Sequence, residues 1–141
     1  MPRSMTHDEV NAFLDERPGW LALSTLGPSG YPHTVPLGYF RLGGDLIMGV
    51  KDRTAKVRNI ERDGRASAML ESGRTGAELK GVLVQGMARI VREPGALLEL
   101  MREGARRRGV ADADLPTSPR PGSVYIRLKP ERVISWDYSS P

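Results

Sequence analysis

The chain has 141 residues, of which 39% are hydrophobic and 27% are charged, and this composition predicts one globular domain spanning residues 1–141. It contains no cysteine, which excludes disulfides, thiol catalysis and cysteine metal sites, and the spacing of His7 and His33 predicts no metal site. No apolar run is long enough to span a membrane and the N-terminus has no signal-peptide core, so we expect a cytoplasmic protein without a membrane partner. The formal net charge of +4 favours anionic partners.

The first 50 residues predict a helix followed by three strands. The run Thr6-His-Asp-Glu9 has the form of a capping box, so we expect a helix from there to about Glu16. Residues 20–26 alternate as a strand, the glycine- and proline-rich segment 27–32 predicts a turn, and residues 33–42 are predicted to form one strand that pairs back. Gly43-Gly44 then predicts a tight turn before a strand over residues 46–50. The apolar residues at helical spacing are Val10, Phe13 and Leu14.

The segment 50–66, VKDRTAKVRNIERDGRA, predicts a basic helix between two strands. Three cations crowd its first turn, Thr54 or Asp52 is placed to cap it, and Gly64 is placed to end it. Because a helix N-terminus is already partly positive, cations there are unfavourable unless an anion lies among them. Exposed backbone N–H groups add to such a binding site for phosphate or carboxylate. The alternative is a basic face in solvent. The three cations are Lys51, Arg53 and Lys56.

The second half of the chain predicts three strands and one helix. We expect strands over residues 65–71, 79–91 and 124–136, with Gly86 as a bend in the second and a break at Pro130 in the third. Pro94 opens a helix to about Arg108, and residues 111–122 form a proline-rich loop. The side chains expected on the buried side of this helix are Leu97, Leu98 and Met101. The arginines near its end, which complement the helix dipole, are Arg102, Arg106, Arg107 and Arg108.

Six mostly antiparallel strands with short inserted helices predict a mainly β (α+β) fold, a six-stranded antiparallel split β-barrel with short flanking helices. Four stretches in this order, GWLALSTLGPSGYPHTVPLGYF, DLIMGVKDRTAKVRNIERDGRASAMLE, ELKGVLVQGMARIV and VYIRLKPERVISWDY, are similar to the flavin-binding split-barrel superfamily that includes pyridoxamine 5′-phosphate oxidase. The chain most resembles its branch of deazaflavin (coenzyme F-420)-dependent oxidoreductases.

The resemblance implies where a cofactor is held. The family's S/T-x-K element, which binds the cofactor phosphate, corresponds to Thr54, Ala55 and Lys56, and Lys51 and Arg53 are placed for further contacts. The flat ring is expected against two strands. Pro36 lacks an N–H and Gly49 lacks a side chain, which suits close approach of a ring; the alternatives are an edge-strand proline and a β-bulge. The ring-binding residues are Thr34, Val35, Pro36, Met48, Gly49 and Val50.

The chain departs from the oxidase itself. The oxidase has an arginine–lysine pair for the flavin phosphate where this chain has Tyr39, Arg41 and Leu42, and a glutamine where this chain has Gly81. Its substrate-binding histidine and arginine near the C-terminus are also missing. Pyridoxamine phosphate oxidation is therefore not expected. Coenzyme F-420, whose tail is a lactyl phosphate carrying glutamates, better matches the basic groove that includes Arg58.

The resemblance implies an oxidoreductase that transfers a hydride from F-420 to an electron-poor C=C or C=N bond of a small-molecule substrate. No catalytic residue is assigned; Tyr31 and Tyr39 are candidates for the proton donor or for packing at the barrel rim. A homodimer with the cofactor in a cleft between subunits is implied, with Trp136 and Tyr138 near that cleft.

Three alternatives remain open. The first is an FMN-binding flavoprotein of the same fold, similar to flavin reductases or oxidases. The second is a non-catalytic protein that carries or senses the cofactor or haem. The third is a nucleic-acid binder. Aromatic residues are only 6% of the chain and are not interleaved with the basic segment, as a single-strand binding surface would require, so we expect no nucleic-acid partner.

Overall fold

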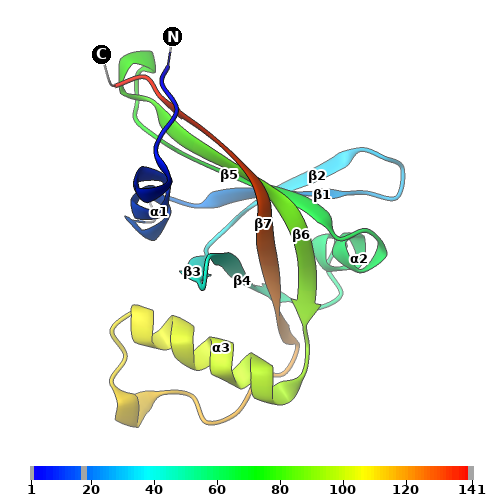
Figure 1. The fold of residues 1–141 in the computed structure, drawn as a ribbon. Helices are drawn as coiled ribbons and strands as arrows, with labels where there is room; N and C mark the ends of the chain where they lie inside the picture. The colour runs from blue at the N-terminus through cyan, green and yellow to red at the C-terminus, as the bar shows by residue number, and fades with distance from the viewer. Residues whose placement is uncertain (1, 17–18, 140–141) are drawn as a thin grey trace.

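Seven antiparallel strands form a single sheet in the computed structural model, in the order β2-β1-β5-β6-β7-β4-β3 (Figure 1). The structure describes residues 2–16 and 19–139. The strands are β1 (Leu21–Leu26), β2 (Pro32–Leu37), β3 (Phe40–Leu42), β4 (Asp45–Lys51), β5 (Arg65–Ser72), β6 (Lys80–Val91) and β7 (Ser123–Asp137). The helices are α1 (His7–Glu16), α2 (Ala55–Arg62) and α3 (Pro94–Arg107), with short 3-10 turns η1 (Gly76–Glu78) and η2 (Asp112–Asp114). The mainly β fold with α+β character is confirmed, but the count of six strands is wrong.

The seventh strand arises because the expected strand 33–42 is two strands. β2 pairs with β1, whereas β3 pairs with β4, so the chain changes partner at Gly38 and Tyr39. β2 and β3 are therefore the two edges of the sheet, although only two residues separate them. Since consecutive Cα atoms are 3.8 Å apart, Leu37 and Phe40 lie within about 11 Å of each other. The sheet curls until its edges approach, and the described strands show no pairing between them, which leaves the barrel split.

The main core lies inside the curled sheet, where α1 and α2 contribute their apolar sides. Val10, Phe13 and Leu14 of α1 are buried as predicted. The capping box is also confirmed: the Glu9 N–H donates to Thr6 Oγ1 at 3.2 Å, and the Thr6 N–H donates to Glu9 Oε1 at 3.0 Å. α2 contributes Val57 and Ile60, and it ends at Arg62, two residues before the expected Gly64. None of the helices in the described ranges is long and apolar enough to cross a membrane.

The helix α3 covers the end of the sheet that is opposite to the chain termini (Figure 1). Leu97 and Leu100 pack with Phe40, Ile47 and Val91 in a second core cluster. Leu97 was predicted to be buried, but Leu98 and Met101 are only half-buried. The side of α3 that packs on the sheet runs through Leu97, Leu100 and Gly104. Leu98 and Met101 lie at the edges of this side and are therefore only partly covered.

The longest strand pair, β6 with β7, contains one irregularity. The register shifts between Gln85, which pairs with Arg132, and Gly86, which pairs with Pro130. A Cβ atom on Gly86 would lie 1.9 Å from the carbonyl oxygen of Lys129, so only glycine fits there. The predicted bend at Gly86 coincides with this shift. The predicted break at Pro130 is wrong, because β7 continues through Pro130 with one extra residue.

Candidate functional site

The N-terminus of α2 has no side chain of its own to cap it. Thr54 occupies the N-cap position in extended backbone, but its hydroxyl makes no capping bond and instead donates to the carbonyl oxygen of Lys51 at 3.1 Å. The first turn contains no acidic residue. Asp52, the other candidate cap, accepts the N–H of Arg53 at 2.7 Å and does not reach the helix. The first N–H groups of α2 are thus left for an acceptor from outside the helix.

Three cations surround this helix end, as the sequence predicted. Lys51 and Arg53 are exposed and Lys56 is half-buried. Within residues 2–16 and 19–139, none of the three takes part in an ion pair. Arg53 adopts φ = 64°, in the left-handed region that is costly for a residue with a side chain. The turn between β4 and α2 therefore combines positive charges that form no ion pair among the described residues with local backbone strain.

Asp52, just before this helix end, and Glu61, in the last turn of α2, are both bound by Arg92, a residue that the sequence analysis missed. Arg92 follows β6, and its guanidinium forms an ion pair with Asp52 and a second one with Glu61 at 2.9 Å. The hydrogen bond from Arg92 lowers the pKa of Asp52 below its usual value. Two carboxylates that would repel an anion are held together by one cation. No local pattern in the sequence pointed to these pairs, because Arg92 is 40 residues from Asp52 and 31 residues from Glu61.

The strand β4 presents its ring-binding candidates on two faces. Met48 and Val50 are buried in the main core, whereas Gly49 faces outward opposite Tyr125 of β7. A Cβ on Gly49 would lie 3.2 Å from Cε1 of Tyr125, so the Tyr125 ring occupies the space beside this glycine. The register between β4 and β7 is regular there, and the alternative of a bulge is wrong.

The candidates on β2 lie at the edge of the sheet. Pro36 is exposed on this edge strand, so the alternative of an edge-strand proline accounts for it. Thr34 is also exposed, and its hydroxyl is 2.8 Å from the hydroxyl of Ser24. Val35 is half-buried. Beside them, Nδ1 of His33 is buried without a hydrogen-bond partner among the described residues.

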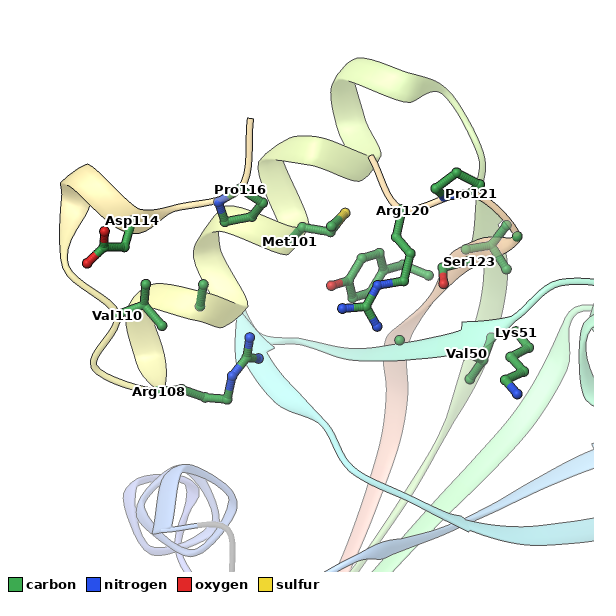
Figure 2. Close-up of a pocket in the computed structure, with 15 residues that line it drawn as sticks. Val50, Lys51, Met101, Arg108, Val110, Asp114, Pro116, Arg120, Pro121 and Ser123 are labelled. Atoms are coloured by element: carbon green, nitrogen blue, oxygen red, sulfur yellow. The ribbon is translucent and has the colours of Figure 1, made fainter. Parts of the chain in front are cut away.

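A pocket of about 800 Å³ opens between β4, α3 and the start of β7 (Figure 2). It brings together Gly49, Val50 and Lys51 of the predicted site. Thr34, Val35 and Pro36 do not line it, and neither do Arg53, Thr54, Ala55 and Lys56. The proline-rich loop after α3 forms one wall, and the Asp52 N–H anchors this loop by donating to the carbonyl of Gly122 at 2.9 Å. Lys51 is the residue through which the pocket adjoins the N-terminus of α2.

A family model described as pyridoxamine 5′-phosphate oxidase matches residues 6–137. The chain belongs to this family. No curated protein matches the sequence.

Solved structures share the fold. The chain is 29% identical to the conserved hypothetical protein Rv2991 from Mycobacterium tuberculosis, with a TM-score of 0.81, over 95% of this chain and 86% of that one. An F420 reductase is 20% identical, with a TM-score of 0.64, over 86% of this chain and 93% of that one. A FAD-binding protein from Mesorhizobium loti is 17% identical, with a TM-score of 0.71, over 97% of this chain and 96% of that one.

Family membership makes the departures from the oxidase informative. Arg41 forms a bidentate ion pair with Asp15, in which Nε donates to Oδ1 at 2.8 Å and Nη2 donates to Oδ2 at 2.7 Å. Arg41 is therefore not available to hold a flavin phosphate. Tyr39 is buried and its hydroxyl donates to the carbonyl of Leu14 at 2.5 Å, so it packs the core and is no proton donor. Tyr31 is exposed beside the turn between β1 and β2.

Gly81, which replaces the oxidase's glutamine, lies under an aromatic ring. A Cβ atom there would come within 2.3 Å of the Trp136 ring, so Gly81 leaves room for that ring to pack on the sheet. Trp136 therefore packs on the sheet of its own chain, while Tyr138 is exposed.

The groups at the N-terminus of α2 fit the phosphate of a family cofactor. A phosphate prefers backbone N–H donors at a helix start, a hydroxyl and a lysine, and Thr54, Ala55 and Lys56 supply these. Asp52, the acid beside this helix end, is already paired with Arg92. The chemistry of this donor set matches an anionic group and does not match a metal cation. In the described ranges, no three His, Asp or Glu side chains are grouped to hold a metal ion.

Proposed function

We propose that this protein is an oxidoreductase that uses coenzyme F-420 to transfer a hydride to an electron-poor C=C or C=N bond of a small molecule. The observation that carries the proposal is the N-terminus of α2, which lacks a side-chain cap and is surrounded by three cations that form no ion pair with any described residue. Membership of a family that takes its name from an oxidase supports a redox function.

The protein's part in this reaction is to bind and orient. The first N–H groups of α2 and the Lys56 ammonium would hold the phosphate of the coenzyme. The Thr54 hydroxyl would join them by exchanging its bond to the Lys51 carbonyl for one to the phosphate. Lys51 and Arg53, both exposed, would bind its glutamate tail. When bound, the coenzyme supplies the hydride. The chain then needs no nucleophile, in keeping with the absence of cysteine.

We also propose that the protein is a homodimer, with the cofactor site completed at the subunit interface. An apolar row crosses the outer face of the sheet, because its members are paired in register: Pro36, Ala22, Met69, Leu83 and Ile134. Met69 and Ile134 are 39% and 36% exposed, which is costly for a monomer in water. Met69→Lys would place a charge in this row and is expected to shift the molar mass in light scattering toward the monomer.

An FMN-binding flavoprotein of the same fold is the second candidate. The fold likeness to the FAD-binding protein from Mesorhizobium loti favours it. FMN ends at its phosphate and needs only the α2 terminus, whereas F-420 carries further negative charge that would reach Lys51 and Arg53. The two cofactors therefore make different demands on these two cations.

The experiment is a fluorescence titration of cofactor-free protein with F-420 and with FMN, on the native chain and on a Lys51→Ala/Arg53→Ala double variant. We expect F-420 to bind more tightly, and the double variant to lose affinity for F-420 far more than for FMN. Arg74→Ala, an exposed arginine in the loop between β5 and β6, is the control. Tighter FMN binding would favour the flavoprotein, and binding of neither would contradict both.

Turnover separates an enzyme from a carrier of the cofactor. In a steady-state assay, we expect enones or quinones to oxidise the reduced F-420 that is bound to the protein. The Lys56→Gln variant, which lacks the Lys56 cation, is the comparison. Tight F-420 binding with no acceptor giving turnover would favour a non-catalytic binding protein.

A further inference from the structure

The large pocket contains two arginines that form no ion pair or side-chain hydrogen bond with the residues that the structure describes. Of the four arginines near the end of α3, Arg102 donates to the carbonyl of Pro116 at 2.9 Å, and Arg106 and Arg107 pair with Glu103 at 3.2 and 2.9 Å. Arg108 forms no ion pair or side-chain hydrogen bond in the described part of the chain. Arg120, in the loop before β7, is equally unpaired there.

Both arginines are directed at the same place. Figure 2 shows the side chain of Arg108 extending from the end of α3, and that of Arg120 from the loop, into the space between α3 and β4. Their charges converge on Tyr125, which also lines the pocket. Burial raises the pKa of Tyr125 above its usual value, and the positive charges of Arg108 and Arg120 partly oppose that rise. Each guanidinium is thus close enough to interact with the phenol.

The phenol of Tyr125 supplies a third donor. Since burial keeps its pKa above the ordinary value of 10, the hydroxyl is protonated at neutral pH and is able to donate. Within the described ranges it makes no hydrogen bond. The ring itself is fixed, because it packs beside Gly49 and against the second core cluster. The pocket therefore has one rigid neutral donor and two cationic ones.

The rest of the pocket is mostly apolar, with two further charges. Asp114 and Lys51 lie at opposite ends in Figure 2, and Asp114 pairs with neither arginine. The apolar wall is formed by Val50, Met101, Val110, Pro116 and Pro121. A volume of about 800 Å³ is within the range of small-molecule sites, which are typically apolar with a few converging polar groups.

We propose that this pocket binds a small organic anion, a carboxylate or phosphate joined to an apolar body, with Arg108, Arg120 and Tyr125 at the anionic group and Met101 and Val110 against the body. Guanidinium groups match the planar geometry of carboxylate and phosphate oxygens, and uncompensated guanidinium groups favour an anion over a neutral ligand. The pocket shares Gly49, Val50 and Lys51 with the predicted cofactor site, but none of them is among the three proposed ligands, so the proposal does not depend on the coenzyme.

The test is a titration of the full chain with 2-naphthoate and with 2-naphthyl phosphate, followed by heteronuclear NMR of the backbone and of the arginine Nε–H groups. Arg108→Gln and Arg120→Gln are each expected to lower affinity about tenfold, the usual effect of one charge-assisted hydrogen bond. Tyr125→Phe keeps the ring and is expected to lower affinity a few-fold. The better of the two probes identifies the anionic group. Inorganic phosphate, which lacks the apolar body, is expected to bind at least tenfold more weakly than either.

The controls separate this pocket from general charge and from the coenzyme site. Arg74→Gln, an exposed arginine in the loop between β5 and β6, is expected to leave affinity unchanged, as is Lys56→Gln at the α2 terminus. Arg108→Gln and Arg120→Gln are expected to leave F-420 and FMN binding unchanged. The proposal is overturned if neither naphthyl probe binds at millimolar concentration, if Lys56→Gln weakens them as much as the pocket variants do, or if the pocket variants bind them normally.

Discussion

The N-terminal ends of α2 and α3 differ in which groups complete them. At α3, the Glu93 side chain accepts the N–H groups of Gly95 and Ala96 at 2.9 and 2.7 Å, and Pro94 fills the first helical position. At α2, the cap position holds Thr54 without a capping bond, and the nearby charges are positive. The fold thus supplies its own anion to one helix and leaves the other without one. The first arrangement contributes to stability, and we interpret the second as a binding site.

The largest effect is expected from reversing the charge at the open helix end. Lys56→Glu places a carboxylate where the phosphate is proposed to bind, and should lower affinity for F-420 or FMN about a hundredfold or more, because an attractive contact becomes a repulsive one. The melting temperature should hold or rise slightly, since an acid in the first turn favours the helix. Cofactor titration and calorimetry measure the two quantities. An equal loss of affinity in Arg74→Glu would show that overall charge, and not this helix end, is responsible.

The closed helix end should respond in the opposite way. Glu93→Ala removes the acceptor of two N–H groups, so we expect the melting temperature to fall by several degrees while cofactor affinity is unchanged. Thr54→Ala, the matched variant at α2, should weaken cofactor binding and leave the melting temperature nearly unchanged. If Thr54→Ala destabilises the protein as much as Glu93→Ala does, the distinction between the two helix ends is wrong.

A smaller effect is expected at Arg92. Arg92→Met releases Asp52 and Glu61 from their ion pairs, and the free Asp52 carboxylate beside the N-terminus of α2 should lower cofactor affinity several-fold through repulsion. Adding Asp52→Asn should recover much of the loss. A double-mutant cycle in the binding assay measures this coupling, and independent effects of the two substitutions would contradict it.

The smallest expected effect is that of low pH on the first turns of the helices. The Arg3 and Thr6 contacts lower the pKa of Glu9 to about 2, and N–H donors lower the pKa of Glu93. A depressed pKa contributes stability above the ordinary value of 4.5, and this contribution is lost as pH falls through the pKa of the folded state. The first turns of α1 and α3 should therefore loosen as pH falls below about 4.5 toward 2, whereas α2, with no acid in its first turn, should not lose a cap. Amide hydrogen exchange across this range compares the three helices, and earlier opening of α2 would count against the prediction.

Local patterns were sufficient to predict most elements but not the surfaces that they form. The Thr6–Glu9 box and the alternation of β1 and β5 are encoded within a few residues, and the structure agrees with them. The split of residues 33–42 was missed because alternation continues through a segment whether or not its pairing partner changes.

The candidate site was predictable to the same extent. The cations before and within α2 are adjacent in sequence, so their grouping was visible. The pocket with Arg108, Arg120 and Tyr125 joins three segments through the curl of the sheet and the path of the loop after α3, and no spacing in the sequence encodes that. The position of Tyr125 beside Gly49 depends likewise on the register of β4 with β7.

The register shift opposite Gly86 has a consequence for the whole of β7. Even-numbered residues such as Ile126 and Leu128 are buried before the shift, whereas Ile134, also even-numbered, belongs to the exposed apolar row after it. Glu131 is the extra residue, and it shifts the alternation of side chains by one position. Even-numbered side chains of this continuous strand therefore point to the core before Glu131 and to the outer face after it. Removing that one residue would force half of the strand to exchange its two faces, which makes Glu131 a determinant of the outer surface although its own side chain is exposed to solvent.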